Sequence, residues 1–153
     1  MSGAGFILAI NLFVAGLLAA SFLMIAVYDR ARVAARWLAL SYSLGMAYFA
    51  IEATIPLFGN AIPVVVLAFA AFLAATVAFN VGLARKYNVT PSWYLLAVLF
   101  VASVVAVTLA QDLPRHSFGR MMAYQGPYFL MQAIAVSIIL SASRLTPLDR
   151  ILA

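Results

Sequence analysis

Glu52 is the one acidic residue that lies within a long apolar segment of this sequence. An ionisable side chain inside a membrane span is costly and is by default a candidate for function, facing the interior of the helix bundle. Ser41, Gly45 and Tyr48 precede it at spacings that place all four residues on one face of a helix. This face is predicted to carry a ligand-binding site. The alternative is a purely structural role for Glu52, in an ion pair with a basic residue from a later loop.

The most polar connection in the sequence, QDLPRHSFGRMMAYQGP (111–127), supplies the other candidates. Gln125, Tyr128 and Gln132 follow at helical spacing and form a polar stripe. Arg115, Arg120 and His116 are the cationic or titratable groups that could pair with Glu52. The predicted ligand-binding residues are therefore Tyr48, Glu52, Gln111, Asp112, Arg115, His116, Arg120, Gln125, Tyr128 and Gln132.

Catalysis and metal binding are not predicted. The sequence has no cysteine, which excludes disulfides and thiolate ligands, and His116 is its single histidine. A metal site usually needs three or four such ligands, so no metal and no cofactor is expected; a haem held through His116 is the less favoured alternative. No nucleophile–base pair, phosphate-binding glycine loop or pair of carboxylates is present, so these residues are not expected to form an enzyme.

Composition decides the class of protein. Hydrophobic residues make up 67% of the 153 residues and charged residues only 8%. Soluble domains carry roughly 25% charged residues, so this chain could not cover a surface that faces water. The net charge of +5 does not indicate nucleic-acid binding, because the basic residues are spread over loops and form no stripe with interleaved aromatic residues. We therefore predict an all-α integral membrane protein, a single multi-pass domain whose main partner is the lipid bilayer.

Five membrane spans account for this length at roughly 20 residues per span. Thr90 and Pro91 are typical of a helix start, as N-cap and first helical residue. The last span is expected to be helical from Tyr128, with an earlier start near Phe118 and a kink at Gly126–Pro127 as an option. The predicted spans are approximately 5–28, 33–55, 61–83, 91–110 and 121–143.

The basic residues predict the orientation. Seven of them fall in loops on one side of these spans and two on the other, so the positive-inside rule places the N-terminus outside and the C-terminus in the cytoplasm. The second, fourth and fifth spans then bring Glu52, Gln111 and Gln125 to one depth near the outer surface. We expect these groups to converge on a polar pocket in which Glu52 has a polar partner from residues 111–132.

The final residues predict a further helix over 147–153. Thr146, Pro147 and Asp149 match a capping box with proline at the first helical position. Either this is a short surface helix, or the chain is the front part of a longer protein; we favour the second interpretation.

Three segments suggest a family. The first is GAGFILAINLFVAGLLAASF, the second, after a basic turn, is ARWLALSYSLGMAYFAIE, and the third is GPYFLMQAIA followed by SR. Together they resemble the N-terminal integral-membrane sensor regions of bacterial GGDEF-type diguanylate cyclases. The resemblance implies a sensory input module in the bacterial inner membrane, expected to be homodimeric, which passes an unknown small-molecule or lipid-soluble signal to a cytoplasmic output domain. The alternatives are a small transporter or channel subunit that uses Glu52 along a substrate path, and an accessory subunit of a membrane complex.

Overall fold

The computed structural model describes residues 3–29, 31–59, 61–114 and 116–142, and these residues form helices and no strands. Two 3₁₀ turns, η1 (Ile55–Phe58) and η2 (Ala110–Asp112), extend the second and fourth α-helices. The five α-helices are α1 (Gly3–Tyr28), α2 (Val33–Thr54), α3 (Ile62–Lys86), α4 (Trp93–Leu109) and α5 (Phe118–Leu140).

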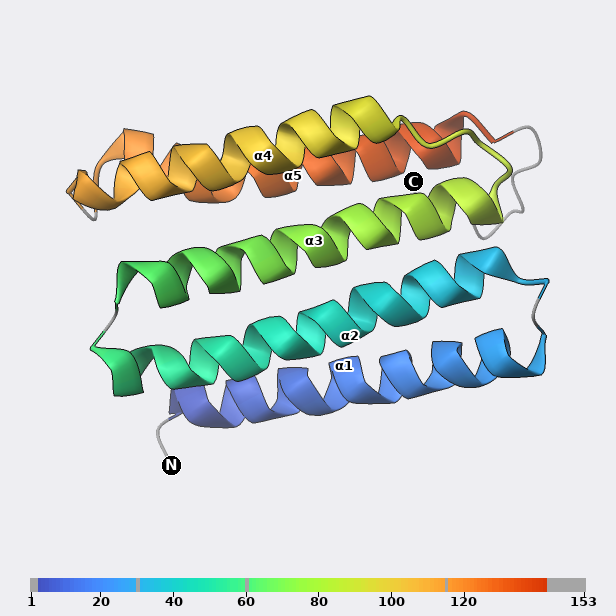
Figure 1. The fold of residues 1–153 in the computed structure, drawn as a ribbon, viewed down its shortest axis with the longest axis horizontal. Helices are drawn as coiled ribbons and strands as arrows, with labels where there is room; N and C mark the ends of the chain where they lie inside the picture. The colour runs from blue at the N-terminus through green and yellow to red at the C-terminus, as the bar shows by residue number, and fades with distance from the viewer. Residues whose placement is uncertain (1–2, 30, 60, 115, 143–153) are drawn as a thin grey trace.

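The helices run roughly side by side along the long axis of the molecule (Figure 1). α1, α2 and α3 follow one another in a row, and α4 and α5 pack together on the other side of α3. One end of the bundle holds the α2–α3 and α4–α5 connections and is called the Pro56 end. The opposite end holds the α1–α2 and α3–α4 connections and is called the Trp37 end.

Each of the five helical segments is long and apolar enough to cross a membrane. Their lengths lie between 20 and 26 residues, with 3₁₀ turns included, and their mean hydropathies between 1.3 and 2.5. A bilayer core needs roughly 20 apolar residues in a helix. The prediction of an all-α protein with five membrane-spanning helices is confirmed at this level, and the chain has the character of a multi-pass membrane protein.

α3 is the central helix of the bundle. It supplies Phe69, Leu73 and Val81 to a buried cluster. Leu96 and Val107 of α4 and Met131 of α5 complete this cluster. Leu73, Val81 and Val107 have no exposed surface. The core therefore lies where α3 meets α4 and α5, and both of those helices are positioned by α3.

α2 and α3 approach each other closely. Ser41 Oγ donates a hydrogen bond of 2.8 Å to the carbonyl oxygen of Ala75 across this interface. A β-carbon added to Gly82 would lie 3.0 Å from the side chain of Leu38, so only glycine fits without a shift of Leu38. α1, by contrast, packs mainly against α2, where Gly16 faces Met46.

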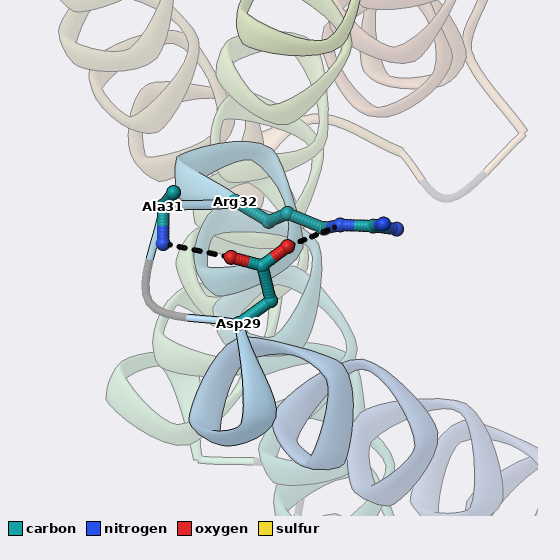
Figure 2. Close-up of polar contacts among 3 residues, drawn as sticks. All are labelled: Asp29, Ala31 and Arg32. Atoms are coloured by element: carbon teal, nitrogen blue, oxygen red, sulfur yellow. Dashed lines mark hydrogen bonds and ion pairs between the residues drawn. The ribbon is translucent and has the colours of Figure 1, made fainter.

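Asp29 organises the turn between α1 and α2 (Figure 2). One carboxylate oxygen accepts from the backbone N–H of Ala31 at 3.1 Å, and the other accepts from Nε of Arg32 at 2.8 Å. The backbone N–H of Arg32 also donates to the carbonyl of Asp29. This arrangement is an Asx-type turn closed by an ion pair, so Arg32 has a local structural role in addition to its charge.

Helix boundaries differ from the prediction chiefly in α3, α4 and α5. α4 begins at Trp93, because Ser92 has non-helical backbone angles and Pro91 lies before the helix. α5 begins at Phe118, the earlier start that the sequence offered as an option, because Ser117 Oγ caps this end by accepting from the N–H of Arg120. It ends at Leu140, before the predicted end at 143.

α3 runs on to Lys86. Asn88 then adopts the left-handed region with φ of 56°. The N–H of Val89 bonds the carbonyl of Ala84, which is a Schellman-type end. The helix predicted over 147–153 lies outside the described residues.

Candidate functional site

Arg120 joins the first turn of α5 to the end of α4. Its Nη1 donates to the carbonyl oxygens of Gln111 and Leu113 at 3.1 and 2.9 Å, and its Nη2 donates to Oε1 of Gln111 at 3.2 Å. Carbonyl groups at the end of a helix lack intrahelical partners and attract a cation. Arg120 therefore caps η2, and its guanidinium is directed at backbone and amide oxygens.

Gln111 is held on both sides of its carboxamide. Its Nε2 donates to the carbonyl of Val107 at 3.0 Å and to the hydroxyl of Tyr124 at 2.6 Å, while its Oε1 accepts from Arg120. The guanidinium of Arg120 also lies 6.0 Å from the centre of the Tyr124 ring. We call these three residues, Gln111, Arg120 and Tyr124, the Gln111 network. Its hydrogen bonds join α4 to α5 at the Pro56 end.

The other predicted residues of this loop lie at its surface. His116 and Gln125 are exposed and line a hollow of about 330 Å³ beside Arg120 and Tyr124. Asp112 is exposed and makes no hydrogen bond or ion pair with any described residue. Arg115 lies outside the described residues.

Glu52 lies on α2 with two tyrosines near it. Tyr48, one turn earlier on α2, and Tyr128 on α5 both lie within electrostatic range of the Glu52 carboxyl group. Phe72 of α3 packs against both tyrosine rings, with ring centres 4.7 Å from Tyr48 and 4.9 Å from Tyr128. Residues of α2, α3 and α5 therefore meet around Phe72, and we call Tyr48, Glu52, Phe72 and Tyr128 the Glu52 cluster.

The other side of Glu52 faces α1. It lines a groove of about 580 Å³ between α1 and α2, together with Leu8, Leu12 and Phe49. No ion pair links Glu52 to Arg120 or His116 within the part of the chain that the structure describes. The purely structural role considered for Glu52, an ion pair with a basic residue, is therefore not observed with Arg120 or His116. The guanidinium of Arg120 instead donates to Gln111 and Leu113.

Gln132 is separate from the other predicted residues. It lies in the middle of α5, is exposed, and lines a cavity of about 370 Å³ on the surface of α2 and α3, with Asn11 of α1 on the opposite side. The sequence could have indicated Asn11 as a candidate, because it is the strongly polar residue of an otherwise apolar helix. Its proximity to Gln132 could not be derived without the order of helices in the bundle.

Asn80 is a further polar residue in the core, with 1% of its surface exposed. Its Nδ2 donates to the carbonyls of Thr76 at 3.0 Å and Met131 at 3.2 Å, and its Oδ1 has no partner among the described residues. The polar pair Thr76 and Asn80 is visible in the sequence as an i, i+4 spacing, but its partner on α5 is not.

Comparisons with known proteins identify no relative. A scan against family models, a search of curated proteins and a search of solved structures each found no match. The described residues also contain no group of three or more histidine or acidic side chains that could hold a metal ion. Function is therefore inferred from the geometry of the Gln111 network, the Glu52 cluster and the cavity that Gln132 lines.

Proposed function

We propose that this chain is a sensory input module, embedded in the bacterial inner membrane, that relays a signal to a cytoplasmic output domain such as a diguanylate cyclase. The observation that carries the proposal is the position of α5. Its first two turns contribute Arg120 and Tyr124 to the Gln111 network, its middle contributes Tyr128 to the Glu52 cluster, and its last turn reaches the Trp37 end (Figure 1). A rearrangement at the Pro56 end would therefore be carried along one continuous helix to the opposite surface.

Pro127 is a point at which α5 can bend. It lies inside the helix, is buried, and lacks the N–H that would bond the preceding turn. Such a proline permits a bend between the helix segment that holds Arg120 and the segment that follows Tyr128. In the proposed module, ligand binding at the Glu52 cluster changes this bend or the rotation of α5, without any chemistry at these residues.

The proposed orientation places the Pro56 end outside and the Trp37 end in the cytoplasm. Among the described basic residues, Arg32, Arg36, Arg85 and Lys86 lie at the Trp37 end and Arg120 lies at the Pro56 end, which supports this direction under the positive-inside rule. A chain without natural cysteines allows a direct test with single cysteines.

Cysteine should be introduced at Thr90 and, separately, at Pro114, both exposed. Thr90 is preferable to Asn88, whose positive φ disfavours other residues. In intact cells a membrane-impermeant thiol reagent should label Pro114→Cys and spare Thr90→Cys. Labelling of Thr90→Cys from outside would refute the orientation.

The functional test uses a fusion of this chain to a diguanylate cyclase domain placed after Ala153. Glu52→Gln keeps the size of the side chain but removes the charge that acts on Tyr48 and Tyr128, so the cellular level of cyclic di-GMP should change several-fold with unchanged membrane insertion. Asp112→Asn is the matched control, because it removes an exposed carboxylate at the same end that contacts no described polar group. Equal output from the native chain and Glu52→Gln would contradict a signalling role for the Glu52 cluster.

A further inference from the structure

The cavity between Asn11 and Gln132 has an unusual composition for the lipid-facing surface of a bundle. α2 and α3 form its floor, and α1 and α5 flank it with these two exposed carboxamides. No lining residue is charged, and Gly45 and Ala75 leave space at the floor. Its lining residues lie within helices that are long and apolar enough to span a membrane, so in a bilayer the cavity would open toward lipid.

The two carboxamides have no partner. Neither the side chain of Asn11 nor that of Gln132 forms a hydrogen bond with any described residue. A polar group without a hydrogen bond in an apolar medium is costly, and a membrane interior offers no water to compensate it. Each carboxamide has an N–H₂ donor group and an acceptor oxygen. A molecule with acceptor oxygens that can reside in the bilayer would satisfy the donors of both.

The walls of the cavity are aromatic. Tyr42, Phe49, Phe72 and Phe79 line it, and the Tyr42 ring is stacked at 5.6 Å on Phe22 of α1. The hydroxyl of Tyr42 also has no hydrogen bond within the described residues. Aromatic walls with offset or edge contacts suit a flat ring. The cavity volume of about 370 Å³ lies within the range of small-molecule sites.

We propose that this cavity binds an uncharged, lipid-soluble ring compound with carbonyl oxygens, the chemistry of a quinone. The N–H groups of Gln132 and Asn11 donate to carbonyl oxygens of the ring, and the aromatic side chains contact its faces. An acyl chain of a phospholipid would fill the volume but leave both carboxamides without a partner. Its ester carbonyls lie near the headgroups, whereas Gln132 lies near the middle of α5.

The site adjoins the Glu52 cluster. Phe72 lines the cavity and also packs against Tyr48 and Tyr128, and Phe49 lines both the cavity and the groove at Glu52. An occupied cavity thus contacts the same ring that joins α2 and α5. Binding itself does not depend on the proposed signalling function, and it is measured without any output domain.

The test uses the full chain in lipid nanodiscs with decylubiquinone as the probe. Binding is followed by competition between decylubiquinone and a photoreactive azidoquinone, with empty nanodiscs as the measure of partition into lipid. We expect saturable labelling of α1 and α5 at one molecule per chain. Labelling that is not saturable, or that equals partition into lipid, would overturn the proposal.

Variants assign the site. Gln132→Leu and Asn11→Leu should each weaken binding about tenfold, the effect of one lost hydrogen bond of ordinary strength. Gly45→Leu should abolish binding by filling the cavity, at a position where an added β-carbon meets no atom within 4 Å. The matched control is Gln125→Leu, which removes an exposed glutamine of the same helix outside the cavity and should leave binding unchanged.

Two further results would overturn the proposal. One is equal binding by the native chain and Gly45→Leu, which would place the quinone elsewhere. The other is a native dimer that becomes a monomer in Gly45→Leu and Gln132→Leu with no quinone bound to either form. That result would make the cavity a contact between two copies of the chain, whose carboxamides satisfy each other.

Discussion

Gln111 and Gln132 are the same residue type in neighbouring helical segments, but their carboxamides differ in hydrogen bonding. Every polar atom of the Gln111 carboxamide is bonded, to Val107, Tyr124 and Arg120. The Gln132 carboxamide has no hydrogen bond to a described residue. The comparison shows that a polar side chain in a membrane span is not in itself evidence for a ligand site.

The difference follows from position along the helix. Gln111 lies in η2, where helix-terminal carbonyls are free and a cation from α5 can bridge to them. Gln132 lies within α5, where the backbone groups are already used by the helix itself. No cation or hydroxyl from a neighbouring helix reaches the Gln132 carboxamide among the described residues, which is why we proposed a partner from outside the chain.

The largest effect is expected for Arg120→Met, which removes three charge-assisted hydrogen bonds. The folded bundle should lose about 2–3 kcal/mol of stability, because each of these bonds involves a charged donor. The free energy of unfolding can be measured by SDS titration of the chain in mixed micelles. Arg85→Met, which removes an exposed arginine at the Trp37 end, is the control and should have little effect. A similar loss in both variants would mean that Arg120 acts only through general charge.

A smaller effect is expected for Gln111→Leu, because the Tyr124 hydroxyl and the Arg120 guanidinium each lose a partner. The expected loss of stability is about 1–2 kcal/mol. The same SDS titration, run as a double-mutant cycle with Tyr124→Phe, should give a coupling of about 0.6 kcal/mol, the usual value for a hydrogen bond between membrane helices. Additive effects would show that the 2.6 Å contact contributes nothing to stability.

The opposite sign is expected for Gln132→Leu without ligand. Replacing an unbonded carboxamide by an apolar side chain should leave the free energy of unfolding unchanged or raise it by up to about 1 kcal/mol. SDS titration of quinone-free protein checks this. A loss as large as that of Gln111→Leu would show that Gln132 has a structural partner and would remove the contrast between the two glutamines.

Gln125→Leu should have the smallest effect, because Gln125 is exposed and unbonded near the Pro56 end of α5. The free energy of unfolding should change by no more than about 0.5 kcal/mol in either direction, as is usual for surface substitutions. Thermal unfolding in nanodiscs, where the surrounding lipid is the same for all variants, gives the needed precision. A clear destabilisation would place Gln125 in the Gln111 network.

The helices were predictable because membrane spans depend on length and apolar composition, which are local properties of a sequence. The residues at which the helices begin and end were less predictable. Pro91 is a standard first residue of a helix, yet α4 begins at Trp93, because Ser92 has non-helical backbone angles. Ser117 was overlooked as an N-cap, although its position three residues before the N–H of Arg120 is a local signal.

The site was predictable only in its local parts. The i, i+4 spacing placed Tyr48 beside Glu52, and the loop 111–127 contained the residues of the Gln111 network. The partner of Arg120 was not predictable, because the backbone carbonyls that it binds have no sequence signature. Asn11 lies on α1 and Gln132 on α5, so their common cavity follows only from the order of helices in space.

The bond from Asn80 to Met131 sets an order of events during biosynthesis. These residues are 51 positions apart, so α3 leaves the ribosome before its partner on α5 exists. At about 5–20 residues per second, the interval is several seconds. During that time the carboxamide retains its bond to Thr76 within the same helix, which lowers the cost of α3 entering the bilayer alone. The arrival of α5 then completes the pairing, so α5 joins a bundle that α1, α2 and α3 have already begun.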